Sequence, residues 1–162
     1  MRLAVLALCT ALLAGCATAP ALLPGSSRSE DVIAAYGQPR RIWPEPDGGR
    51  TLEYSSQPMG RHCYMVRLAA DGRLVSIEDG LSAANRARIE PGMTPEQVSR
   101  MLGAERSRVF FRLSGEDVWD WTVEPDQIGS YGLRFNVHFK DGRVLRTTQS
   151  MVFPSRFPGM DD

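Results

Sequence analysis

The chain contains little cysteine, histidine or lysine. Its 162 residues include three cysteines and two histidines, and Lys140 is the one lysine among 19 basic residues. This small number of thiols and imidazoles is a poor ligand set for a transition metal. We therefore predict no metal site. The 19 acidic residues balance the 19 basic ones, which argues against the basic surface typical of nucleic-acid binding. We therefore predict no nucleic-acid partner.

Long apolar runs are also scarce, and the most apolar stretch stands at the N-terminus. After Arg2, residues 3–13 are almost wholly apolar, and small residues follow. This run is shorter than the roughly 20 residues that a membrane-spanning helix needs. A basic residue, a short apolar run and small residues in this order are typical of a secretory signal. We predict that residues 1–15 are this signal.

A cysteine follows the apolar run directly. The sequence of residues 13–16, Leu-Ala-Gly-Cys, resembles the lipobox of bacterial lipoproteins. The resemblance implies cleavage between Gly15 and Cys16 and covalent lipid on Cys16. It also implies an outer-membrane address, because Ala17 stands where an aspartate would retain such a protein in the inner membrane. The alternative is an ordinary signal cut near Ala19, which would discard Cys16.

The third cysteine has a different role from the first two. Cys9 would leave with the signal and Cys16 would carry lipid, so Cys63 remains as a single thiol. We predict that Cys63 is free and at least partly buried in a strand, and that no intramolecular disulfide holds the fold.

Two stretches of the chain resemble each other. Val98 follows Val32 by 66 residues, Gly103 follows Gly37 by the same interval, and an Asp-Gly pair closes each stretch. An internal repeat of this length constrains the whole fold. We therefore predict a tether at 16–23, a first repeat at 24–80, a second repeat at 81–152 and a tail at 153–162.

The second repeat has clear helix signals. Ser82 predicts the start of a short helix over 83–88. Thr94, with a proline after it and Gln97 three residues on, predicts a capping box that opens a second helix. Val98 falls on the inward face of this helix, and Gly103 is placed to end it in a left-handed conformation.

Strands follow these helices. Residues 133–140 alternate strictly between apolar and polar, which predicts a strand with one buried and one wet face. The Asp-Gly pair at 141–142 predicts a hairpin turn, with a return strand over 144–152. Residues 118–123 form a further strand that puts two tryptophans on one face, and residues 108–113 are a candidate for another.

The first repeat shows one irregularity. Its inward set, Tyr64, Val66 and Leu68, lies one residue out of register with the corresponding set of the second repeat when both are counted from the Asp-Gly pair. A one-residue shift would turn the inward face outward. We predict one extra residue in the turn at 69–72, or a bulge beside it.

Together these patterns predict an α+β fold. Each repeat consists of one or two helices followed by three or four antiparallel strands, a helix(-helix)-β-β-β unit. The helices must bury their apolar faces, so we expect them to cover one face of an antiparallel sheet.

A motif in the second repeat resembles a known family. Residues 89–98 read Ile-Glu-Pro-Gly-Met-Thr-Pro-Glu-Gln-Val, and Leu-Gly at 102–103 and Trp-Asp-Trp at 119–121 follow. This pattern is similar to that of the SmpA/OmlA family of small outer-membrane lipoproteins. The structural motif residues are Gly92, Met93, Thr94, Gln97, Val98 and Gly103. The first repeat keeps Gly-Gln-Pro at 37–39 but has Gly-Ser-Ser at 25–27 instead of Gly-Met-Thr.

The resemblance implies a function. The best-known members are the smallest lipoprotein component of the outer-membrane β-barrel assembly machine. We therefore expect a non-enzymatic scaffold or accessory subunit, held by lipid at the inner leaflet of the outer membrane and facing the periplasm. Its expected partners are subunits of that machine. Tandem αα-β units also occur in the β-lactamase inhibitor protein family, so the alternative is a periplasmic binder or inhibitor of an enzyme.

No group of side chains indicates catalysis. His62 and Cys63 are neighbours, so on a strand they point to opposite faces. His138 falls on a wet face and is expected to be solvated. The acidic cluster over 116–120 fits a charged hairpin end beside buried tryptophans better than a catalytic carboxylate pair. We predict no catalytic residues, no small-molecule substrate and no cofactor apart from the lipid.

One tryptophan is a candidate contact with a partner. Trp43 stands beside Arg41, and tryptophan with arginine is typical of interface anchors. The alternative is that Trp43 packs over the edge of the sheet. Trp119 and Trp121 are expected in the core, and the aromatic tail at 153–162 docks on the second repeat or a partner, or is disordered.

Overall fold

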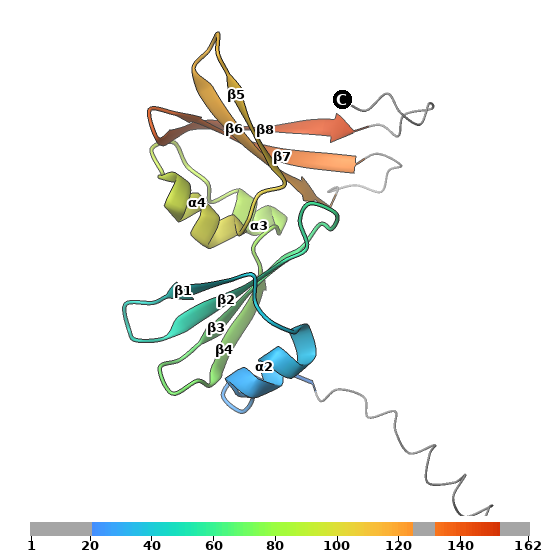
Figure 1. The fold of residues 1–162 in the computed structure, drawn as a ribbon, viewed down its shortest axis with the longest axis vertical. Helices are drawn as coiled ribbons and strands as arrows, with labels where there is room; N and C mark the ends of the chain where they lie inside the picture. The colour runs from blue at the N-terminus through green and yellow to red at the C-terminus, as the bar shows by residue number, and fades with distance from the viewer. Residues whose placement is uncertain (1–20, 125–131, 153–162) are drawn as a thin grey trace, which may run out of the picture.

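The described chain forms two four-stranded antiparallel sheets with short helices beside and between them (Figure 1). The computed structural model describes residues 21–124 and 132–152. The first half contains α2 (Ser29–Tyr36), β1 (Arg41–Pro44), β2 (Arg50–Ser55), β3 (Cys63–Leu68) and β4 (Leu74–Asp79). The second half contains α3 (Ala83–Arg86), α4 (Pro95–Leu102), β5 (Ser107–Phe111), β6 (Glu116–Val123), β7 (Gly132–Lys140) and β8 (Arg143–Val152). In both sheets the strands lie side by side in chain order.

The elements stack in layers. α2 covers the outer face of the first sheet, α3 and α4 lie between the two sheets, and the second sheet forms the far end (Figure 1). One apolar cluster joins Val32 of α2 to Val66 of the first sheet. The other joins Val98 of α4 to Met65 of the first sheet and Phe135 of the second. α4 is therefore shared by both sheets.

The sequence predicted antiparallel strands mixed with a few helices, and the structure shows this architecture. The arrangement of the sheets differs from the expectation in two ways. There are two sheets rather than one, and the first sheet is covered on both faces. The reason is visible in β3, where Val66 faces α2 while Cys63 and Met65 face α4. Within residues 21–124 and 132–152, none of the helices has the length and apolarity that crossing a bilayer requires.

The helix starts follow their local sequence. Thr94 Oγ1 accepts the N–H of Gln97 at 3.2 Å, and Gln97 Oε1 accepts the N–H of Thr94 at 2.8 Å, so the predicted capping box is confirmed. Ser82 Oγ accepts the N–H of Asn85 at 3.3 Å and starts α3 as predicted. α3 ends at Arg86, two residues earlier than expected.

Both halves use the same contact to hold the chain before the longer helix. In the first half, Gly25 N–H donates to Leu74 O at 2.8 Å, and the Arg73 guanidinium donates to Gly25 O at 3.0 Å. The corresponding residues of the second half are Gly92, Val144 and Arg143, with the same two distances. This shared pairing shows that the two halves are built alike. Leu22 packs on the first apolar cluster, so the folded part begins within the stretch predicted as a tether.

The register problem of the first half is resolved by its hairpin. Leu68 pairs with Leu74 across residues 69–73, whereas Phe139 pairs with Val144 across residues 140–143. The first turn is thus one residue longer, as predicted. Each hairpin also has a register shift just before the turn.

A buried carboxylate joins the two halves. Glu53 of β2 has none of its surface exposed. Its Oε1 accepts the backbone N–H of Ala104, directly after α4, at 2.8 Å, and its Oε2 accepts the indole N–H of Trp43 at 3.0 Å. One donor comes from each half of the molecule. The carboxylate therefore holds its hydrogen bonds only while the halves stay in this arrangement.

A buried amide makes a second joint. Gln57, in the loop between β2 and β3, donates from Nε2 to Thr122 O at 2.7 Å and accepts the Thr122 N–H at 3.2 Å. The Gln57 side chain is 4 % exposed. It makes one donated and one accepted hydrogen bond with the backbone of Thr122 in β6, as a neighbouring strand would. The loop of the first sheet is thereby fixed to the end of the second.

A glycine permits the two halves to approach closely. Gly103 ends α4 with φ 73° and ψ −163°, a conformation essentially restricted to glycine. Its φ is positive as predicted, but its ψ is not that of the left-handed helix. A Cβ at this position would overlap the Sγ of Cys63 in the first sheet. Gly37 ends α2 with almost the same angles, φ 79° and ψ −160°, but faces open space.

This pair of glycines separates backbone strain from packing. We expect Gly37→Ala to lower the free energy of unfolding by about 1–3 kcal/mol through strain alone. Gly103→Ala should lower the free energy of unfolding by about 1–3 kcal/mol more than Gly37→Ala, because its Cβ overfills the contact between the two halves. Urea unfolding of both variants measures the difference. Adding Cys63→Ala to Gly103→Ala should recover part of that difference, and equal losses for the two glycine variants would contradict the close approach.

The buried carboxylate has its own test. Glu53→Gln turns one hydrogen-bond acceptor into a donor, so we expect it to lower the free energy of unfolding by about 1–3 kcal/mol. Glu78→Gln is the matched control, since Glu78 lies in the same cross-strand row but is exposed. It should change stability by less than about 0.5 kcal/mol. Similar losses for both variants, measured by thermal and urea unfolding, would show that Glu53 does not support the joint.

Candidate functional site

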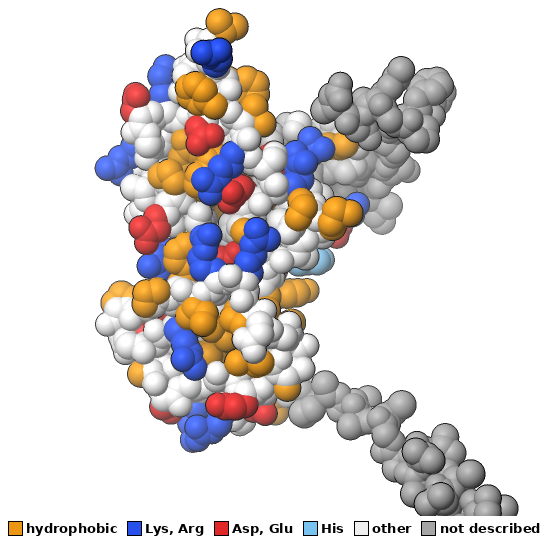
Figure 2. All heavy atoms as spheres, in the orientation of Figure 1, with side chains coloured by type: hydrophobic (Ala, Val, Ile, Leu, Met, Phe, Trp, Pro, Cys, Tyr) orange, Lys and Arg blue, Asp and Glu red, His pale blue; other side chains and the backbone are white. Residues whose placement is uncertain are grey.

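The strongest surface feature of the described chain is an apolar strip along β5 and the turn after it. Val109, Phe110, Phe111 and Leu113 are 47 %, 62 %, 51 % and 106 % exposed. They lie on the hairpin of β5 and β6, which projects from the upper end of the molecule in Figure 1. In Figure 2, hydrophobic side chains alternate with basic ones over this region. Clustered exposed apolar side chains of this kind mark interaction surfaces.

The pairing of β5 with β6 divides the strip between two faces. Val109 pairs with Val118 and Phe111 with Glu116, so both belong to the face of the second sheet that no described helix covers. Arg108 pairs with the buried Trp119, and its guanidinium lies 3.8 Å from the centre of that ring, on the helix-covered face. Phe110 follows Arg108 on this second face. The strip therefore presents apolar groups on both sides of one strand.

The open face of the second sheet carries a polar network. His138 Nδ1 lies 2.7 Å from Glu116 Oε2, and its Nε2 lies 2.9 Å from Thr148 Oγ1. Arg146 donates to both oxygens of Glu116, at 3.1 and 2.8 Å. The side chain of His138 is 14 % exposed, so the expectation that it is solvated is wrong. Polar groups from the two neighbouring strands, β6 and β8, enclose it.

This network has the order hydroxyl, imidazole and carboxylate, which is also the order of a nucleophilic relay. It differs from a relay because Arg146 binds both oxygens of the Glu116 carboxylate. Arg146 and His138 together lower the pKa of Glu116, with the Arg146 hydrogen bond as the larger cause. Asn136 Nδ2 also donates to Thr148 Oγ1 at 3.2 Å. The arrangement fixes the neighbouring strands to one another and keeps this face polar.

The predicted acidic cluster is divided between separate partners. Glu116 belongs to the network, and Asp117 accepts the indole N–H of Trp119 at 2.9 Å. Asp120 binds Arg106 and the Ser107 hydroxyl. The three carboxylates do not form a catalytic pair. Among the described residues, no group of three or more acidic, histidine or cysteine side chains is arranged to hold a metal ion.

The residues proposed to contact a partner lie at the joint between the halves. Trp43 is half-buried, and the guanidinium groups of Arg41 and Arg100 lie 4.8 and 4.9 Å from its ring centre. Its indole N–H is bound to Glu53. The ring therefore works within the molecule as a link to α4, which matches the alternative interpretation. Arg41 remains exposed.

The family-motif residues all have structural positions around α4. Gly92 and Met93 pair through their backbones with Val144, and Met93 also packs on the larger apolar cluster. Thr94 and Gln97 cap α4, as described above. Val98 is fully buried between the sheets and Gly103 adjoins Cys63.

Cys63 is free and fully buried in β3, as predicted. Burial raises the pKa of its thiol to about 12, with the Glu53 carboxylate as a further cause. A thiol in this state is a poor nucleophile. Gly15, Cys16 and the tail at 153–162 lie outside the described residues.

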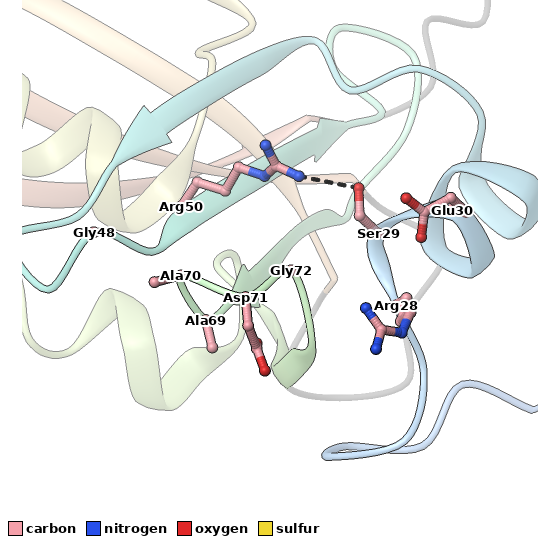
Figure 3. Close-up of a pocket in the computed structure, with 9 residues that line it drawn as sticks. All are labelled: Arg28, Ser29, Glu30, Gly48, Arg50, Ala69, Ala70, Asp71 and Gly72. Atoms are coloured by element: carbon pink, nitrogen blue, oxygen red, sulfur yellow. Dashed lines mark hydrogen bonds between the residues drawn. The ribbon is translucent and has the colours of Figure 1, made fainter.

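A shallow polar hollow lies at the start of α2 (Figure 3). Arg28, Ser29 and Glu30 line it from the helix, and Arg50 reaches in from β2, donating to Ser29 Oγ at 3.2 Å. The turn of residues 69–72 closes the other side. Its two arginines are balanced by the carboxylates of Glu30 and Asp71, so it offers no net charge to a ligand.

Sequence reasoning missed the strip on β5. The signal was present, because Val-Phe-Phe-Arg-Leu at 109–113 places apolar residues at consecutive positions. A strand with one buried face alternates instead, as residues 133–140 do. Consecutive apolar residues indicate a strand buried on both faces, or one with a surface left for a partner.

Comparisons with known proteins give little further guidance. No protein-family model matches the chain, and no curated protein is similar to it. Among solved structures, a DUF4309 family protein, YjgB, from Bacillus subtilis is similar over 80 % of this chain and 82 % of its own, with 22 % identity and a TM-score of 0.30. This likeness is too weak to support an inference about function.

The polar network should affect acid stability. The pKa of Glu116 is lowered from its ordinary value of 4.5, so its ion pairs stabilise the fold fully above that pH. This contribution disappears as the pH falls through the lowered pKa of the folded state. We expect stability to fall less steeply between about pH 5 and pH 3 in Glu116→Gln than in the wild type. Urea unfolding across this range, with Glu90→Gln as an exposed control, measures the slopes. Identical slopes in all three proteins would contradict the assignment.

Proposed function

We propose that this chain is a non-enzymatic outer-membrane lipoprotein that supports the assembly of β-barrel proteins or the integrity of the envelope through protein contacts. Lipid on Cys16 would hold it at the inner leaflet, facing the periplasm. The lipobox-like residues 13–16 and the SmpA/OmlA-like motif around α4 support the location and the class.

The observation that carries the binding role is the apolar strip on β5. Val109, Phe110 and Phe111 are about half or more exposed in a strand whose fold needs only one buried face. The joints at Glu53 and Gln57 fix the two halves, so the strip is held in a set position relative to the rest of the molecule. A fixed surface of this kind suits a scaffold that positions partners.

A second candidate is a periplasmic binder or inhibitor of an enzyme. The uncovered face of the second sheet favours it, since a binder of this kind would use such a face. That face is dominated by the network around His138, however, and its exposed aromatic side chain, Phe111, stands at the β5 edge. We therefore prefer the scaffold.

The anchor is tested by changing Cys16. We expect Cys16→Ala to abolish labelling with palmitate in growing cells and to move the chain out of the membrane fraction, because stable anchoring requires the acyl chains. Cys9→Ala is the matched control, since that residue would be removed with the signal. It should leave labelling and fractionation unchanged. Normal labelling of Cys16→Ala would refute the lipid anchor.

The partner is tested by affinity purification of the full chain from solubilised membranes. Barrel-assembly subunits recovered in stoichiometric amounts would support the specific role. Their absence, with a hydrolase recovered instead, would support the second candidate and leave the location intact.

A further inference from the structure

The outer edge of β5 is unpaired among the described residues. β5 pairs with β6 on one side, and the order of the sheet leaves its other side without a neighbour. Exposed edges of this kind are usually protected by charges, proline or a bulge, because they bind other strands. The residues 109–111 at this edge are apolar instead, and their exposure makes an added strand favourable.

The side chains of β5 define what an added strand would meet. On the open face, Val109 and Phe111 would contact it, so apolar residues fit there. On the helix-covered face, Phe110 follows Arg108, and Arg112 is the exposed first residue of the turn after β5. Arg108 is paired with Glu105 at 2.5 Å, whereas Arg112 has no acidic partner among the described residues. An acidic residue therefore fits at the end of the added strand that lies beside Arg112.

A second copy of the chain fits this edge poorly. Antiparallel pairing of two β5 strands centred on Val109 would bring Arg112 near Arg106 of the other copy, just beyond the ends of the paired strands. Pairing centred on Phe110 would bring Arg112 near Arg108 of the other copy. Like charges directly opposite each other destabilise strand pairs. The charge pattern thus disfavours self-association in both registers that use most of the strand.

We propose that the β5 edge binds an extended segment of a partner protein by strand addition. The segment has apolar residues at its centre and an acidic residue at the end that lies beside Arg112. Its backbone would extend the second sheet, and its side chains would cover Phe111 on one face and Phe110 on the other. This inference deepens the proposed scaffold role and rests on it for the identity of the partner.

The test uses the full chain, purified with the N-terminal processing that the cell gives it, and a labelled peptide. The probe is Ser-Glu-Val-Leu-Val-Glu-Thr-Ser, and a second peptide has lysine at both glutamate positions. We expect fluorescence anisotropy to show binding of the acidic peptide and weaker binding of the basic one. Phe110→Ser combined with Phe111→Ser should weaken binding about tenfold, since the apolar contacts are lost. Leu145→Ser, on the opposite edge strand, is the matched control and should bind normally.

Charge reversal distinguishes specific strand pairing from nonspecific hydrophobic binding. Arg112→Glu should weaken binding of the acidic peptide two- to fivefold and strengthen binding of the basic peptide. The changes are small because each charge pair between strands contributes modestly. Lys140→Glu, at an exposed position of β7, should change neither. Circular dichroism establishes that the variants fold.

Three results would overturn the proposal. The first is equal affinity for the acidic and basic peptides. The second is a dimer in light scattering that Phe110→Ser with Phe111→Ser dissociates. The third is binding to phosphatidylglycerol vesicles that the same double change abolishes. Each result is judged from the difference between the wild type and a β5 variant with the same N-terminus, so failure here is distinct from failure of the anchor.

Discussion

The arrangement of this molecule depends on one buried carboxylate. Glu53 lies in the middle of the first sheet, yet it accepts a backbone N–H from the second half and an indole N–H from its own. Losing one partner of a buried charge is costly, because the remaining charge cannot regain its water. The position of Ala104 relative to β2 is therefore fixed more strongly than apolar packing alone would fix it. At the other end of the contact between the halves, the buried amide of Gln57 has the same role, because it binds the backbone of Thr122.

This joint explains why α4 and its flanking residues carry the most regular sequence signals. The helix is packed between two sheets, so its start, its inward residue Val98 and its end at Gly103 all meet fixed surroundings. α2 covers one sheet alone, and Gly37 ends it facing open space. The same backbone conformation therefore meets two different constraints. The motif residues between Gly92 and Gly103 are therefore the set that allows one helix to pack against two sheets.

The local elements were predictable from the sequence, and the way they pack together was not. The capping box at Thr94 and the alternation over 133–140 depend on neighbours within a few residues, and both were read correctly. Met65 and Glu53 could not be placed, because their burial depends on a helix some 30 to 50 residues further along the chain. The network around His138 was missed for the same reason. Strand alternation assigned it to the wet face, but only the adjacent strands supply the groups that enclose it.

The fold does not account for the exposed apolar residues of the strip on β5. β7 places its alternate apolar residues in the shared core, and its opposite face is polar. β5 has apolar residues on both faces although the core needs neither Val109 nor Phe111. Edge strands are under pressure to lose such residues, since they invite wrong pairings. Their presence is explained if an extended strand of a partner protein covers them.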